Sequence, residues 1–154
     1  MKKTWLTAAI FLGTFTLNPA YCIDNNPLPE THRHHASGSL DTRTSLGLSA
    51  EMKQHQLSNM REHVAAIKSI TGLMSENKFE EASNIAHAKL GLTAEMQQMC
   101  SMFNNEKFMT LGLAFHRSGD ELGDTLHTGD VNASLRALNK TMSYCVECHA
   151  NFRQ

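Results

Sequence analysis

Apolar residues recur at steps of three and four from Ser49 onward, which is the spacing of one face of an α-helix. Ser49 can cap a first helix, and Gly72 and Asn77 bring it to a close. The apolar face of this helix is expected to contain Leu57, Met60, Val64, Ile67 and Met74. The pattern therefore predicts one long helix with a single buried face.

Three further helical segments follow, each bounded by residues that begin or end helices. The second covers about 79–90 and ends at Gly91, a favourable residue just past a helix, and Thr93 can cap a short continuation. The third covers about 106–128, and Asp130 can cap a fourth that runs almost to the end of the chain. Together these segments predict an all-α fold, an antiparallel four-helix bundle.

The fourth segment has the most regular pattern in the chain. Its key positions alternate steps of four and three without interruption, and they are Val131, Leu135, Leu138, Met142, Cys145, His149 and Phe152. This pattern is typical of a bundle helix that buries one face against its neighbours. We therefore expect Cys145 and His149 to point into the bundle core.

The run Cys145-Val146-Glu147-Cys148-His149 is the c-type haem attachment pattern. The two thiols can add to the vinyl groups of haem, and the imidazole can coordinate the iron from one face. Structural zinc is the main alternative, but it normally takes four ligands from two pairs, and the sequence has no second CxxC, CxxH or HxxxH pair. The motif predicts haem c in the bundle core, held covalently by Cys145 and Cys148, with His149 as the proximal iron ligand.

The first 22 residues have the features of a secretory signal peptide. Lys2 and Lys3 precede an apolar run over 5–17, and small residues follow at Ala20 and Cys22. The run is too short to span a bilayer comfortably, so we expect no transmembrane segment. Bacteria attach haem covalently after export, and the two signals together predict a periplasmic protein.

Composition and charge narrow the remaining choices. The chain has 154 residues and a formal net charge of −1, which becomes −3 when the two lysines of the signal peptide are removed. No basic stripe suggests a nucleic acid partner. Residues 23–48 hold few apolar side chains and many turn formers, so we expect a disordered tail before a single haem domain over 49–154.

The glycines in the helix over about 106–128 and Cys100 in the short segment before it call for an explanation in terms of packing. Gly112, Gly119 and Gly123 share a ridge with His116, and each glycine inside a helix costs about 1 kcal/mol relative to alanine. Close approach of a flat macrocycle or of a neighbouring helix would explain the ridge, whereas a loosened surface turn is the alternative. Cys100 is either a buried small residue or, if Cys22 is retained, half of a disulfide.

The chain resembles the cytochrome c′ family of four-helix-bundle c-type cytochromes over about Ser49 to Arg153. The first helix carries an NMR-[DE]-H run at 59–63. The third carries an M-x-x-G-x-x-x-H run at Met109, Gly112 and His116. The ending matches CxxCHxx-aromatic-Arg at Cys145, Cys148, His149 and Arg153. The resemblance implies that His149 is the proximal ligand, that the first helix crosses the distal face of the haem, and that a homodimer is possible.

The sixth iron position has three candidate states. Met60 would give a His/Met site that suits electron transfer. Leu57, a haem contact by the resemblance, would instead leave the iron five-coordinate and open to NO or CO. His116 would give a bis-His site.

The other histidines and the terminal arginine have ordinary expected places. His63 is expected at the rim of the haem pocket, and His55, His87 and His127 in solvent. Arg153 can pair with a haem propionate.

The leading function is therefore an electron carrier, not an enzyme, with other periplasmic redox proteins as its transient partners. The alternative is a five-coordinate haem protein that binds NO or CO.

Overall fold

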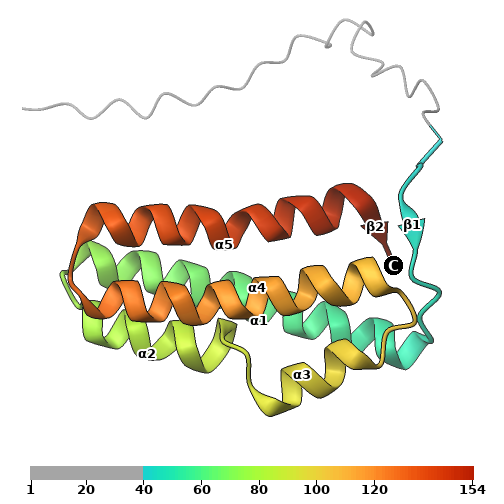
Figure 1. The fold of residues 1–154 in the computed structure, drawn as a ribbon, viewed down its shortest axis with the longest axis horizontal. Helices are drawn as coiled ribbons and strands as arrows, with labels where there is room; N and C mark the ends of the chain where they lie inside the picture. The colour runs from blue at the N-terminus through green and yellow to red at the C-terminus, as the bar shows by residue number, and fades with distance from the viewer. Residues whose placement is uncertain (1–39) are drawn as a thin grey trace, which may run out of the picture. The chain divides into compact units, whose positions relative to one another are not determined.

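The computed structural model describes residues 40–154, which form an all-α fold with one short strand pair (Figure 1). In chain order the elements are β1 (Thr44–Ser45), α1 (Ala50–Ser75), α2 (Phe79–Leu90), α3 (Ala94–Ser101), α4 (Glu106–His127), α5 (Val131–Asn151) and β2 (Phe152–Arg153). No helix in this part of the chain is long and apolar enough to cross a membrane. The signal peptide and the tail over 23–39 lie outside the described residues.

The helices begin where the sequence predicts. Ser49 caps α1 by accepting a hydrogen bond from the Met52 amide at 3.2 Å, and Thr93 caps α3 in the same way. Asp130 accepts from the Ala133 amide at 2.9 Å at the start of α5. Each such cap stabilises a helix end by about 1 kcal/mol. Asn77, in the left-handed region with φ 59°, ends the turn after α1.

The main core joins α1, α2, α4 and α5. α2 packs against both α1 and α4, and α4 also packs against α5. The completely buried apolar side chains at these contacts are Ile70, Ala82, Ala86, Leu90, Leu122 and Leu126. A smaller cluster of Phe108, Leu111 and Phe152 closes the end of the fold where α5 gives way to β2.

The buried face of α5 differs from the predicted stripe. Leu138 is buried, but Val131, Leu135 and Met142 are 44–49% exposed. Ser134 and Thr141 are completely buried instead. Thr141 donates its hydroxyl to the Ser118 carbonyl of α4 at 3.1 Å, so a small polar residue lies where the helices come close. The prediction was wrong here because an apolar pattern does not count a residue such as Thr141, whose hydroxyl bonds to a neighbouring backbone, nor the small Ser134, whose buried hydroxyl has no partner among the described residues.

The glycine ridge of α4 serves contact with a neighbouring helix. A Cβ at Gly119 would overlap the Leu90 carbonyl of α2, and one at Gly123 would overlap the His87 ring. α2 and α4 therefore lie closer together than a residue larger than glycine at position 119 or 123 would allow. Of the explanations considered for Gly119 and Gly123, helix packing is confirmed.

The end of the predicted tail is ordered. β1 pairs in parallel with β2, and the Leu46 amide donates to the Arg153 carbonyl at 3.1 Å. Arg43 pairs with Asp41 at 2.8 Å and also donates to the His149 carbonyl at 3.4 Å. The tail prediction was wrong over 40–48 because composition does not register backbone pairing with a distant segment. We call residues 40–46 the strap.

Replacing Gly119 with alanine should destabilise the fold because the new methyl group pushes α2 and α4 apart. Overpacking of this kind costs about 1–3 kcal/mol. Gly72→Ala is the matched control, because a Cβ at this position would meet nothing within 4 Å. The substitution also replaces a glycine inside a helix with a better helix former. We expect the control to gain about 0.5–1 kcal/mol in urea unfolding. Equal effects of the two substitutions would contradict the close approach.

Candidate haem site

An apolar cavity of about 430 Å³ lies among α1, α3, α4 and α5. This volume falls within the range of about 300–1,000 Å³ that is usual for small-molecule and cofactor sites. Its wall is mostly apolar, and its polar groups are few. The groups able to bind a metal or to react are carried by α1, α3, α4 and α5.

All three groups of the CxxCH motif line this cavity. Cys145 and Cys148 are half-buried, and His149 lies beside them on the last turns of α5 with more exposure. Burial raises the pKa of both thiols, and that of Cys148 reaches about 11 because Cys145 and Glu147 add negative charge nearby. Both thiols are protonated at neutral pH. The structure thus brings two SH groups and one imidazole to the wall of one apolar space.

The residues of α1 that line the cavity do not include Leu57, the predicted haem contact. Met60, His63 and Ile67 line the cavity, but Leu57 is half-buried elsewhere. At about 100° per residue, Leu57 lies roughly 20° beyond Val64 around the helix, so it falls just past the edge of the side that lines the cavity. The sulfur of Met60 accepts a long hydrogen bond from Nε2 of Gln154 at 3.7 Å.

His63, which was predicted at the rim of the haem pocket, lines the cavity and is half-buried. Its ring contacts Phe115 at a centroid distance of 4.9 Å and meets His116 edge-on at 5.5 Å, with 77° between the planes. Burial, with a smaller effect of His116, lowers the pKa of His63 to about 4. The imidazole of His63 is therefore neutral at pH 7.

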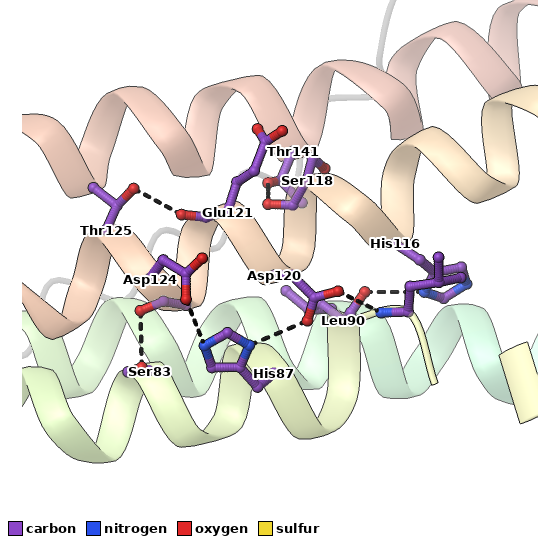
Figure 2. A network of polar contacts seen from close by, with 12 residues as sticks. Ser83, His87, Leu90, His116, Ser118, Asp120, Glu121, Asp124, Thr125 and Thr141 are labelled. Carbon is purple, nitrogen blue, oxygen red and sulfur yellow. Dashed lines mark hydrogen bonds and ion pairs between the residues drawn. The ribbon is translucent and has the colours of Figure 1, made fainter. Parts of the chain in front are cut away.

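His116 is held in one tautomer by the backbone of α2. The side chain is buried, and its Nδ1 lies 2.9 Å from the Leu90 carbonyl (Figure 2). A carbonyl oxygen can only accept, so Nδ1 carries the hydrogen. Burial lowers the pKa of His116, which keeps the ring neutral and leaves a lone pair on Nε2. His116 also lines the cavity.

A polar network behind His116 fixes the turn that follows α2. Asp120 accepts from the Leu92 amide at 2.9 Å and pairs with Nδ1 of His87 at 3.1 Å. Asp124 lies 3.5 Å from the other nitrogen of His87, as Figure 2 shows. His87 was predicted to be solvated, and this was wrong, because two carboxylates one turn apart on α4 face it across the close helix contact.

His127 also has an acidic partner rather than a purely solvent environment. Its Nδ1 lies 2.9 Å from Oε2 of Glu80, and both side chains remain well exposed.

The short helix α3 supplies a sulfur-rich part of the wall. Met99 is buried, and its sulfur accepts a hydrogen bond from the Asn59 amide at 3.1 Å. Cys100 is buried as well, 3.2 Å from the position that a Cβ on Gly112 would take. Cys100 is thus confirmed as a buried small residue. The disulfide alternative involves Cys22, which lies outside the described residues.

Arg153 does not reach the cavity. Its backbone belongs to β2, and its Nε lies 3.8 Å from Asp41 of the strap. The pairing of Arg153 with a haem propionate stays a prediction. Val64 was predicted on the buried face of the first helix, but it is 68% exposed, and Val146 of the CxxCH motif is 71% exposed; both line the cavity.

The predicted residues fall into two groups. Met60, His116, Cys145, Cys148 and His149 share one cavity, whereas Leu57 and Arg153 lie outside it. Comparison of the chain with protein-family models, curated proteins and solved structures finds no match in any of the three. Function has to be inferred from this cavity and the side chains around it.

The Cys100 thiol should react slowly with iodoacetamide in the native protein. Burial raises its pKa, and the thiolate is the reactive form, so the alkylation rate should keep rising with pH above the range of an exposed cysteine. Peptide mapping by mass spectrometry gives the rate at Cys100, and unfolding in urea should remove the protection. A rate equal to that in urea would contradict the burial of this thiol.

Proposed function

We propose that this chain is a periplasmic c-type cytochrome that carries single electrons on a covalently attached haem. The observation that carries the proposal is the convergence of Cys145, Cys148 and His149 on one apolar cavity. In this proposal α1, α2, α4 and α5 form an antiparallel four-helix bundle around the cofactor. The signal peptide predicted from the sequence supports the periplasmic location.

The residues around the cavity fit a haem in size and in character. The thiols and the imidazole come from adjacent turns of α5, which is the arrangement that attachment and proximal ligation need. Val64 and Val146 are strongly exposed although both line the cavity. A flat apolar group between α1 and α5 would cover them, which would stabilise the complex by removing apolar surface from water.

The thiols of Cys145 and Cys148 hold the cofactor by adding across its two vinyl groups. In each addition the S–H bond breaks, a C–S bond forms, and the hydrogen goes to the other vinyl carbon, so no oxidant is required. His149 supplies the proximal nitrogen. The strap acts on the same turn, since Arg43 donates to the His149 carbonyl and thereby holds the end of α5 in place.

When bound, the haem supplies a one-electron Fe(III)/Fe(II) couple. The apolar wall from α1, α3 and α4 keeps water away from it and so tunes its reduction potential. Met60, His63 and His116 each present a group able to coordinate iron, and a second protein ligand closes the site to substrates. This is the basis for a carrier, not an enzyme, that docks transiently with other periplasmic redox proteins.

The second candidate is a five-coordinate haem protein that binds NO or CO. One observation favours it: the Met60 sulfur is hydrogen-bonded to Gln154, so it is partly committed to a protein partner. In this case the distal side of the iron would stay open.

The test is expression of the full chain in a bacterium that has the haem attachment machinery. We expect the purified protein to carry the added mass of one haem, which survives denaturation. A Cys145→Ser, Cys148→Ser double variant should lose all covalent haem, and Cys100→Ser is the matched control that should keep it. A wild-type chain that is exported without haem, or a control that loses it, would overturn the proposal.

Optical spectra of the loaded protein separate the two candidates. Sharp low-spin bands that do not respond to CO in the dithionite-reduced protein are expected for the electron carrier. Broad high-spin bands that shift at once with CO would make gas binding the leading function.

A further inference from the structure

The cavity offers two kinds of iron ligand on the same helix, one turn apart. Met60 presents a thioether, and His63 presents an imidazole. The sulfur of Met60 has a partner in Nε2 of Gln154, and the buried sulfur of Met99 has one in Asn59. Both of these cavity thioethers are thus engaged with side-chain amides.

Of the two side chains, His63 is better placed than Met60 to coordinate the iron. Its ring is held in the wall by its contacts with Phe115 and His116. Among residues 40–154 the His63 ring has no hydrogen-bond partner. A largely buried imidazole normally has a partner for each nitrogen. His63 faces the cavity, and the ring of His116 lies beside it.

His116 completes the arrangement from behind. Its Nδ1 hydrogen is given to the Leu90 carbonyl, so its Nε2 can only accept. The two rings meet edge-on with 5.5 Å between their centroids, so the imidazole of His116 lies beside the His63 ring as a candidate acceptor for its N–H. A histidine that binds a metal typically donates its other N–H to such an acceptor, which fixes the tautomer and makes the ligating nitrogen more basic.

The geometry points to His63 as the sixth iron ligand, in place of Met60, with His116 as the positioning residue that orients it. The inference rests on the proposed function. A chain of hydrogen bonds would then run from His63 to His116 and on to the Leu90 carbonyl. The second nitrogen of His63 would keep its lone pair for the iron. His116 itself is less suited, because it is only 5% exposed and its ring is tied to α2.

The experiment uses the full-length, haem-loaded protein, in which attachment has first been established by mass. Electron paramagnetic resonance and the near-infrared band of the ferric form distinguish two imidazole ligands from an imidazole and a thioether. We expect the two-imidazole pattern in the wild type. Met60→Leu should keep it, whereas His63→Ala should become high-spin, bind CO when reduced, and regain low-spin bands on addition of free imidazole.

His63→Met keeps a coordinating side chain at the same position and serves where the alanine variant fails to fold. It should replace the two-imidazole pattern with the far-red methionine–iron band. Loss of the low-spin pattern in Met60→Leu would overturn the inference in favour of Met60. A wild type that is high-spin and binds CO would overturn it in favour of an open site.

The role of His116 is tested by a pair of substitutions. His116→Leu removes the acceptor, so the low-spin pattern should persist while the reduction potential rises, because His63 loses basicity. His116→Gln offers an amide oxygen in its place and should return the potential toward that of the wild type. A high-spin spectrum in His116→Leu together with an unchanged spectrum in His63→Ala would make His116 the ligand and overturn the assignment. Chains without covalent haem would instead refute the proposed function.

Discussion

The close contact between α2 and α4 at Leu90 and Gly119 is the constraint on which the rest of the structure depends. Only a glycine lets the two backbones approach this far, and the approach brings the Leu90 carbonyl to the ring of His116. Asp120, one position beyond Gly119, then secures the turn after α2 through the Leu92 amide. A single packing contact therefore sets the back wall of the cavity and the protonation pattern of a side chain in it.

The cavity combines a rigid side with a more open one. α2, α4 and α5 are joined by completely buried residues such as Leu122 and Ser134. Along α1 and α5, in contrast, Val64 and Val146 stand exposed in the wall of the cavity. On the first side His116 is held by its hydrogen bond to the Leu90 carbonyl, and on the second side the apolar side chains of Val64 and Val146 are exposed to solvent. This division suits a large flat ligand that enters between two helices and meets preset partners within.

The helices could be predicted from the sequence because their signals are local. Ser49, Thr93 and Asp130 cap helices through their own neighbours, and no distant residue is needed. The composition of the cavity wall depends on helix rotation, which neither an apolar pattern nor the resemblance fixes, so Leu57 was expected at the haem although it does not line the cavity. The pairing of the strap depends on a contact between distant segments, and the ordinary composition of residues 40–48 gave no sign of it.

The strap also bears on the order in which the fold is completed. Arg43 reaches a carbonyl 106 positions further along the chain, so this contact closes nearly all of the described residues into one loop. Closing so long a loop is entropically costly, whereas the turns between consecutive helices close short ones. We expect the helices to associate first and the strap to dock last. The last two turns of α5, which carry Cys145 and Cys148, would then remain accessible until the fold is otherwise complete.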